Sequence, residues 1–245
     1  MEIKVIKTIL QEIQQLRNLF LHDNKFQFIH NKCHAAGWAD TYLITLDERK
    51  IGYGSVWGND KREIKDTIFE FYLMQPFQRL ASFVFPKLID AANVPFMECQ
   101  TNDRLLSSMF FEFTKNIKVE AILFEEHYTT DLKIPGTIFR RDKPDDDLSY
   151  DPAEYVLELN KEIVATGGFV RNYNLPYIDM FMEVKEEHRR RGFGSFVVQE
   201  LKKEAYLKGR VPAARCNPDN KASKATLLKA GLKVCGHLLV GELKR

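Results

Sequence analysis

Apolar residues recur along the chain with two different periods, and each change of period marks a new element. Residues 5–21 carry apolar side chains three and four positions apart, which predicts a helix with one buried face. Residues 41–46 and 51–57 alternate between apolar and polar side chains, and the charged stretch Asp47-Glu48-Arg49-Lys50 separates them. This alternation predicts a β-hairpin.

The rest of the first half continues with the same two patterns. A weaker helical pattern covers residues 26–36. Strands are predicted over 67–74, 96–99 and, once or twice, 117–132, and helices over 77–92 and 103–113. Asn102 or Asp103 is the predicted N-cap of the last helix, because short polar side chains satisfy the first free N–H groups of a helix.

The same order of elements returns in the second half of the chain. A hairpin is predicted over 155–159 and 163–170, followed by a strand over 177–184, a helix over 194–208, a strand over 213–216, a helix over 221–230 and strands over 232–235 and 238–243. Between the halves, the charged stretch 140–147 contains a proline and predicts a linker or an exposed loop.

A short sequence match supports two copies of one unit. Val94-Pro95 precedes Cys99 by the same spacing as Val211-Pro212 precedes Cys216. We therefore predict an α/β (α+β) protein built from two tandem units, residues 1–135 and residues 136–245. A chance match of short apolar segments is the alternative.

The stretch Arg189-Arg190-Arg191-Gly192-Phe193-Gly194 lies between a predicted strand and a predicted helix. The first N–H groups of a helix lack intrahelical partners and attract anions, and glycine lets the backbone approach a phosphate closely. The stretch therefore predicts a site for a nucleotide-type pyrophosphate, with a basic turn before an amphipathic helix as the alternative. Neighbouring His188 is expected to be structural.

Composition narrows the class of protein. The 245 residues carry a net charge of only +2, which gives no electrostatic case for nucleic acid. The four cysteines have neither metal nor disulfide spacing, so no metal site is predicted and reduced thiols in a cytoplasmic protein are expected. The N-terminus does not resemble a signal peptide, and no apolar run is long enough for a membrane span.

Two motifs together resemble the GNAT superfamily of acyl-CoA-dependent N-acyltransferases. Arg189-x-x-Gly192-x-Gly194 matches its Arg/Gln-x-x-Gly-x-Gly/Ala signature in full. The second signature, Asn-x-x-Ser and then Lys-x-Gly-Phe, resembles Asn220-Lys221-Ala222-Ser223 and Lys229-Ala230-Gly231-Leu232, where leucine replaces phenylalanine. The resemblance covers about residues 155–243. It implies a mixed, mostly antiparallel sheet flanked by helices, and a degenerate GNAT-like first unit without a phosphate loop.

The resemblance also implies acetyl-CoA, or another acyl-CoA, as the cofactor of residues 136–245. The pyrophosphate is expected on backbone N–H groups from Arg191 to Ser195, and the pantetheine arm along residues 180–184. A backbone N–H near Met182 to Val184 would polarise the thioester oxygen. The expected cofactor-binding residues are Met182, Val184, Arg189, Arg190, Arg191, Gly192, Phe193, Gly194, Ser195, Asn217 and Asn220.

An attacking amine must lose a proton, so a base is expected near this strand. The positions that commonly face the substrate in the family hold Ile178, Met180 and Met182, which are all apolar. Glu183 is the predicted base if a β-bulge reverses the alternation of faces, and otherwise it is a solvated strand residue.

The leaving thiolate needs a proton as well. Leu227 occupies the position where many family members have a tyrosine that acts as general acid. Members with the Asn-x-x-Ser motif can use its serine instead, so Ser223 is the predicted catalytic acid. The alternative for Ser223 is a serine in the first turn of a helix that satisfies backbone groups. Asn220 is either the helix cap or a pantetheine contact, or both.

The resemblance thus implies an N-acyltransferase that moves an acetyl or other acyl group from acetyl-CoA to a primary amine by direct attack in a ternary complex. The acceptor would be a small molecule, an amino acid or a peptide, with neither nucleic acid nor membrane as partner. The alternative is a non-catalytic acyl-CoA-binding module or sensor, which the apolar strand positions and the missing tyrosine favour. The sequence predicts no oligomeric state.

Overall fold

The structure is a computed structural model that describes residues 2–244 except 25, 28, 59, 60, 62, 145 and 147–152. It divides into two compact units, which we call the N-terminal unit (Met1–Glu120 and Gly236–Arg245) and the C-terminal unit (Ala121–Cys235). The limits predicted for the two sequence copies, 1–135 and 136–245, stay a prediction. Asp145 and Asp147 of the predicted linker lie outside the described residues.

The sheet of the N-terminal unit has the strand order β1-β2-β3-β4-β5-β12. The bounds are β1 Ile3–Thr8, β2 Asp40–Leu46, β3 Arg49–Trp57, β4 Thr67–Leu73, β5 Phe96–Gln100 and β12 Leu232–Leu243. All described pairings in it are antiparallel except the short parallel contact between β4 and β5.

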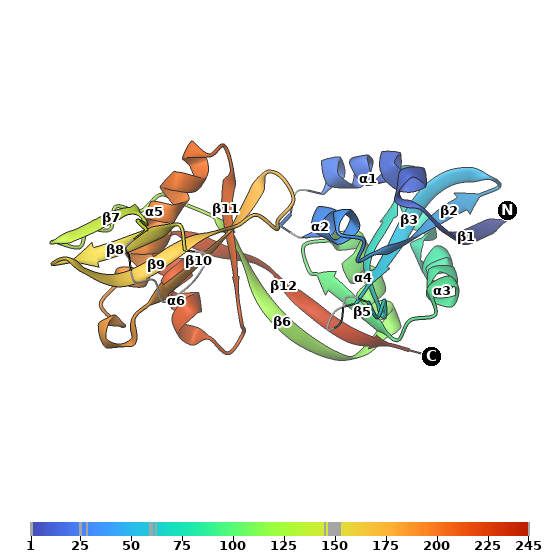
Figure 1. Ribbon diagram of the computed structural model, residues 1–245. Helices are drawn as coiled ribbons and strands as arrows, with labels where there is room; N and C mark the ends of the chain where they lie inside the picture. The colour runs from blue at the N-terminus through green and yellow to red at the C-terminus, as the bar shows by residue number, and fades with distance from the viewer. Residues whose placement is uncertain are drawn as a thin grey trace. The chain divides into compact units, whose positions relative to one another are not determined.

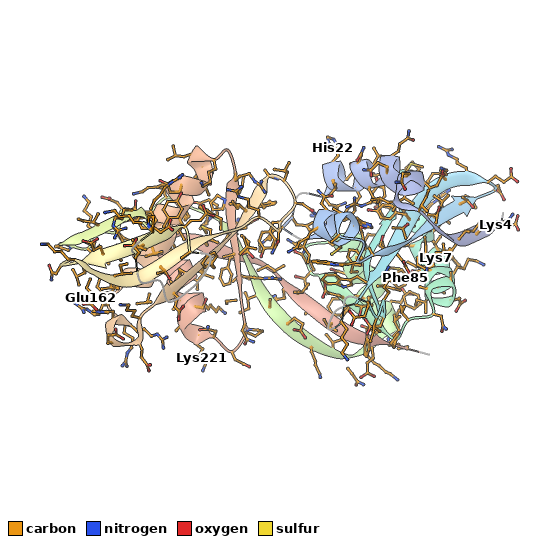
Figure 2. The ribbon with its side chains drawn as sticks, viewed as in Figure 1. Lys4, Lys7, His22, Phe85, Glu162 and Lys221 are labelled. Carbon is orange, nitrogen blue, oxygen red and sulfur yellow. The ribbon has the colours of Figure 1, made fainter. Side chains whose placement is uncertain are left out.

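Helices cover this sheet on both faces (Figure 1). The helical elements are α1 Leu10–Asp23, α2 His30–Ala35, the 3-10 turn η1 Gln75–Leu80, α3 Ala81–Ala92 and α4 Arg104–Phe113. α3 and α4 bury Val84, Phe85 and Phe110 in an apolar core on one face, and Phe85 is labelled in Figure 2. α1 packs against β2, β3 and β4, and its buried residues belong to the other face.

The sheet of the C-terminal unit has the strand order β6-β11-β10-β9-β8-β7. The bounds are β6 Thr114–Glu126, β7 Thr137–Arg141, β8 Tyr155–Leu159, β9 Glu162–Val170, β10 Tyr177–Val184 and β11 Val211–Cys216. The helical elements are the 3-10 turn η2 Glu186–His188, α5 Phe193–Leu207 and α6 Lys221–Lys229. Val197 and Leu201 of α5 and Leu227 of α6 share one apolar core, so both helices pack on the same face.

Each sheet is completed by a strand from the other half of the sequence. Residues 238–242 of β12 pair antiparallel with β5, in the N-terminal unit. Residues 122–125 of β6 pair antiparallel with β11, in the C-terminal unit. The expected mixed, mostly antiparallel sheet flanked by helices is therefore confirmed, but each sheet takes its last strand from the distant half of the chain.

Most predicted elements are present, and three predictions are wrong. Residues 3–8 form strand β1, paired with β2 from Ile3 opposite Leu46 to Thr8 opposite Thr41, and the helix starts only at Leu10. Residues 140 and 141 belong to strand β7 and not to a linker. The two closing strands are one continuous strand, β12.

No helix within the described residues is long and apolar enough to cross a membrane.

Candidate functional site

The site begins at the point where β10 and β11 separate, which we call the fork. The two strands pair in parallel only from Tyr177 opposite Val211 to Asp179 opposite Ala213. Beyond Asp179, β10 continues to pair with β9 as far as Val184, whereas β11 continues along β6. One edge of β10 is therefore open toward the diverging strand.

Backbone N–H groups of β10 point into this opening. Lys185 donates its N–H to Val164 of the β9 edge at 3.0 Å. Successive N–H groups of a strand point to opposite sides, so those of Met180, Met182 and Val184 point away from β9 and into the fork. The edge offers donors to an extended, amide-containing ligand in the manner of an added strand.

The chain then turns into α5 through the arginine and glycine loop. Gly192 is the N-cap residue with φ of 88°, a left-handed conformation that disfavours any residue with a Cβ. No side chain caps this end of α5, and its first intrahelical bond runs from Phe196 N–H to the Gly192 carbonyl at 3.1 Å. The N–H groups of residues 193–195 are thus left for an anion, as predicted for a helix that begins after glycine.

Gly194 has a different role from Gly192. A Cβ at residue 194 would lie 3.2 Å from Cε of Met182 and 3.2 Å from Cγ2 of Thr226. A side chain here would push on both walls of the site, so Gly194 brings the N-terminus of α5 close to β10 and α6. Nearby, the hydroxyl of Ser195 donates to the Thr226 carbonyl at 3.2 Å.

The three arginines are exposed, and two of them are fixed by neighbours. Arg189 Nε donates to the Val184 carbonyl at 3.1 Å, and Arg191 Nη1 lies 3.2 Å from Nδ1 of His188. The guanidinium of Arg191 also covers the ring of Phe193, 5.1 Å from its centroid. The loop is therefore held in place by its own basic side chains.

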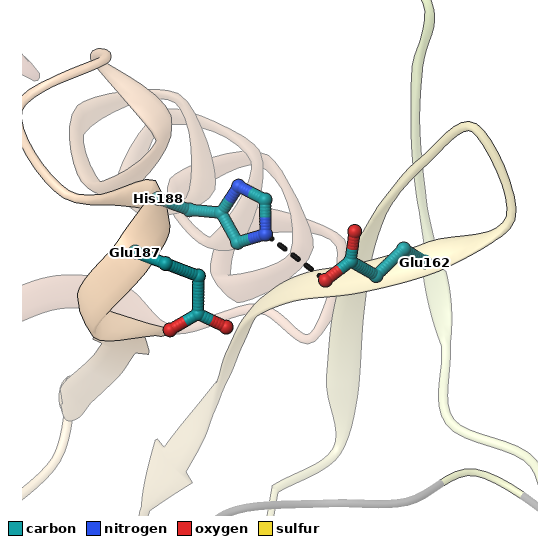
Figure 3. A group of neighbouring side chains, drawn as sticks. All are labelled: Glu162, Glu187 and His188. Carbon is teal, nitrogen blue, oxygen red and sulfur yellow. Dashed lines mark hydrogen bonds and ion pairs between the residues drawn. The ribbon is translucent and has the colours of Figure 1, made fainter.

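His188 links the loop to the neighbouring hairpin. Its Nε2 lies 3.0 Å from Oε1 of Glu162, which lies at the start of β9 (Figure 3). Ligand atoms of Glu162, Glu187 and His188 lie within 4.8 Å of one another, close enough for three ligands of one metal ion. Glu162 and Glu187 are exposed, and His188 already has two side-chain partners, Glu162 and Arg191. The arrangement agrees with the structural role predicted for the histidine.

α6 supplies the opposite wall. Asn220 caps it by accepting the Ser223 N–H at 2.9 Å, which confirms the predicted cap. Burial raises the pKa of the nearby Cys216 thiol, and a hydrogen bond with Ser223 partly opposes this rise. Ser223 is half-buried and lies in the first turn of α6, with its hydroxyl near a thiol.

These walls enclose a cleft of about 780 Å³, within the range of small-molecule sites. Eleven of the thirteen predicted site residues line it: Met182, Glu183, Val184, Arg189, Arg190, Gly192, Phe193, Gly194, Ser195, Asn220 and Ser223. Arg191 and Asn217 do not line it. Arg191 is directed to His188, and Asn217 accepts the Asp219 N–H at 2.8 Å in the turn before α6.

Sequence reasoning missed two neighbours of the loop. A Cβ built on Gly192 would lie 3.8 Å from Nζ of Lys229 and 3.9 Å from Cδ1 of Ile134. Lys229 therefore brings a further positive charge to the anion site from the last turn of α6. The lysine belongs to the second GNAT-like motif, so the signal was in the sequence, whereas nothing in the sequence marked Ile134.

Two carboxyl groups of β10 differ strongly in environment. β10 pairs with β9 from Asp179 to Val184 without a register shift, so the bulge that would turn Glu183 to the other face is absent there. Glu183 is exposed. Asp179 is the last residue before the fork, and burial raises the pKa of its carboxyl to about 7, although Arg215 and Tyr173 oppose the shift.

Family comparisons match both halves of the chain. The model described as an acetyltransferase (GNAT) domain matches residues 9–127, and the model described as FR47-like protein matches residues 160–237. No curated protein matches the chain.

Several solved structures share the fold at low identity. The chain is similar to an acetyltransferase from the GNAT family of Colwellia psychrerythraea, with TM-score 0.74, 15% identity and full coverage of both chains. A tandem GNAT protein from the clavulanic acid biosynthesis pathway has TM-score 0.61 and 9% identity, over 100% of this chain and 99% of that one. A GCN5-related N-acetyltransferase from Sphaerobacter thermophilus has TM-score 0.58 and 13% identity, over 99% and 96%.

Proposed function

Because the chain belongs to the GNAT superfamily, with two such units in tandem, we propose that its C-terminal unit is an N-acyltransferase that uses acetyl-CoA or another acyl-CoA and a primary amine. The observation that carries this proposal is the meeting of two features in one cleft. The open edge of β10 and the uncapped N-terminus of α5 lie on its walls together.

The residues present fit such a cofactor. The N–H groups of residues 193–195, with Arg190 and Lys229 beside the loop, suit a diphosphate. The N–H groups of Met180, Met182 and Val184 suit the amides of a pantetheine arm. Asn220 and Ser223 line the facing wall. When bound, acyl-CoA supplies an activated thioester.

The main catalytic contribution of the strand is then a fixed donor. The N–H of Met182 points into the fork and is positioned to donate to the thioester oxygen as negative charge develops there. One such preorganised donor is worth on the order of 3 kcal/mol in the transition state. The cleft adds proximity, because it holds amine and thioester in one enclosed space.

The amine proton has two candidate acceptors on β10. Glu183 lines the cleft and is exposed, so it can pass a proton directly to solvent. Asp179 lies at the closed end of the fork, and the pKa of its buried carboxyl, about 7, suits a base that works near neutral pH.

We propose Ser223 as the acid that protonates the leaving thiolate, since Leu227 is a buried core residue and has no proton to give.

Calorimetry with CoA and a thiol-release assay over a panel of amines test the proposal. Gly192→Asp should abolish CoA binding, because it forces a Cβ into a left-handed backbone and puts a carboxylate at the diphosphate site. Arg79→Ala, in η1 of the N-terminal unit, is the matched control and should bind CoA normally. If Gly192→Asp keeps its affinity for CoA and Arg79→Ala loses it, the cofactor binds the N-terminal unit instead.

The alternative function, a non-catalytic acyl-CoA-binding module or sensor, predicts a different result in these assays. A sensor would bind acyl-CoA through the same loop and release no thiol with any amine. The buried Leu227 at the usual tyrosine position is the observation that favours it. Thiol release that depends on the amine excludes the sensor.

A further inference from the structure

The N-terminal unit has a fork of its own. β4 and β5 pair in parallel only at Thr67 opposite Phe96 and Ile68 opposite Met97, and then separate. Directly after this point β4 contains a β-bulge, because Val56 of β3 pairs with Ile68 but Ser55 pairs with Glu70. Bulges of this kind are common beside active and binding sites, where they redirect a side chain.

The bulge turns two successive residues of β4 toward α2. The ring of Phe69 lies 5.9 Å from the ring of His34, and Oε2 of Glu70 lies 2.8 Å from Nε2 of the same histidine. Oε2 of Glu70 also accepts from Ser55 at 3.2 Å and lies 3.7 Å from Nε of Arg17. The face of the sheet that α1 and α2 cover therefore buries a polar cluster among aromatic side chains such as Phe20, Tyr53 and Phe69. The core under α3 and α4 on the other face is apolar.

Burying so many ionisable groups costs free energy, which a purely structural interior would avoid. The described residues that are polar and almost fully buried in this unit include Arg17, Gln27, His34, Ser55, Glu70, Glu98, Gln100 and Asp103. Buried polar groups that cluster where two strands separate are typical of a binding site.

A small cavity lies at one side of this cluster. Its lining consists of Phe26, Phe69, Glu98, Cys99, Gln100, Asp103 and Leu106. Glu98 and Gln100 line it from β5, where they alternate with Met97 and Cys99, which belong to the apolar core. The cavity measures about 10 Å³, close to the minimum that holds one water-sized group.

The Gln100 amide supports a polar occupant of the cavity. Its side chain is 3% exposed, and within the described part of the chain neither its amide oxygen nor its amide nitrogen has a hydrogen-bond partner. A buried amide without partners costs about 1–3 kcal/mol for each unsatisfied group. A polar guest in the cavity would remove this cost.

The residues that line the cavity favour a positively charged ligand. The lining offers two carboxyl groups and an amide oxygen as acceptors, with the rings of Phe26 and Phe69 beside them and no basic side chain. An anion would be repelled. A water-sized cation with several N–H donors satisfies the carboxyl groups and the amide oxygen and also gains from the aromatic faces.

We propose that this cavity binds the ammonium group of a small primary amine, as a second site that is separate from the acyl-CoA cleft. Glu98 and Asp103 balance the positive charge, and the Gln100 oxygen accepts one of its hydrogens. Asp103 also caps the N-terminus of α4 by accepting the Leu106 N–H at 3.0 Å, so the same side chain would contact both the bound ammonium group and the helix. The site does not depend on acyl transfer.

Thermal melting in different chloride salts at equal ionic strength tests this site. Ammonium and methylammonium should raise the melting temperature above that in potassium, because a ligand that binds only the folded chain stabilises it. Tetramethylammonium has no N–H group and should give no rise. Equal melting in all four salts would mean that the cavity holds only a water molecule, and equal stabilisation by potassium would mean a general cation site; either result overturns the proposal.

Variants localise the effect. Glu98→Gln removes a charge without changing size and should weaken methylammonium binding at least tenfold, as should Gln100→Leu. Glu112→Gln removes a charge from an exposed position of the same unit and should change nothing. Gly192→Asp should keep amine binding while it loses CoA, so failure of the acyl-CoA proposal and failure of this one are told apart. Unchanged methylammonium affinity in Glu98→Gln would overturn the assignment.

Discussion

Arg191 Nη1 lies 3.2 Å from Nδ1 of His188, and this contact fixes the tautomer of the histidine. A guanidinium can only donate, so Nδ1 must accept and the ring proton must lie on Nε2. Nε2 is then the donor to Oε1 of Glu162, 3.0 Å away (Figure 3). The three side chains form one chain of hydrogen bonds that positions the loop before α5.

His188→Ala should therefore weaken CoA binding although the histidine need not touch the cofactor. Loss of one such hydrogen bond corresponds to about 1 kcal/mol, or roughly a fivefold rise in Kd by calorimetry. In a double-mutant cycle, Arg191→Ala should cost less in the His188→Ala background than in the wild type. Glu162→Gln keeps an acceptor oxygen and is the control with near-normal affinity. Additive effects of the two alanine variants would show that they act independently.

Gly194→Val should reduce CoA affinity at least tenfold, because a branched side chain would displace Met182 and Thr226 from the walls of the cleft. The Cβ alone would lie 3.2 Å from Thr226 Cγ2, so Gly194→Ala should lower CoA affinity less than Gly194→Val does, and the crowding should cost about 1–3 kcal/mol of stability. Thr226→Ser removes that methyl group and should partly restore CoA binding in Gly194→Ala. Normal affinity in Gly194→Val would mean that these walls do not bound the cofactor site.

The position of the arginine and glycine loop before a helix was predictable from sequence because the pattern is local. Gly192 precedes α5 as its N-cap and Gly194 lies in its first turn, after strand β10, and that order alone places helix N–H groups beside the glycines. The face on which Glu183 lies was not predictable in the same way. It depends on the register of strand pairing, and alternation in the sequence cannot reveal a one-residue shift.

The position of the bulge shows this limit directly. A bulge in β10 was the condition for Glu183 as base, but β10 pairs with β9 without one, and a bulge occurs instead in β4 beside Glu70. The buried polar cluster around Glu70 also gave no sequence signal, because its members come from α1, α2, β3, β4 and β5 and meet only in the fold.

Wrong secondary-structure predictions have similar tertiary causes. Residues 5–8 have helical spacing but pair with β2, where backbone hydrogen bonds outweigh a weak local preference. Arg140 makes ion pairs with Asp146 and with Glu158 of β8, which accommodate a charged residue in strand β7. Charge alone therefore misidentified this strand as a linker.

Ser223→Ala should lower turnover by about a hundredfold if the hydroxyl is the acid, with CoA affinity unchanged within about twofold. Ser223→Thr keeps a hydroxyl and should retain most of the activity in the thiol-release assay. Asn220→Ala removes the cap of α6 and should cost about 1 kcal/mol of stability, which separates the helix-capping role from the chemical one. Unchanged turnover in Ser223→Ala would remove it as the acid.

Asp179→Asn should change the pH dependence of stability. Burial raises the pKa of the folded carboxyl to about 7, whereas the unfolded chain loses this proton near pH 4. Between these values the folded state binds more protons than the unfolded state, so the unfolding free energy falls as pH rises from about 4 to about 7. Asparagine has no charge to bury. The variant should therefore gain stability relative to wild type across this window and hold a constant difference above it.

Urea unfolding of both proteins from pH 4 to pH 8 measures this difference. Burial raises the pKa of Asp103 to about 7 as well, so the stability of Asp179→Asn should still fall as pH rises, but less steeply than that of the wild type. Phe181→Leu, two residues along the same strand, carries no titratable group and should shift stability equally at every pH.

The same Asp179→Asn protein tests which residue is the catalytic base. If Asp179 takes the amine proton, its turnover should fall sharply while Glu183→Gln stays active, and the reverse result would assign the base to Glu183.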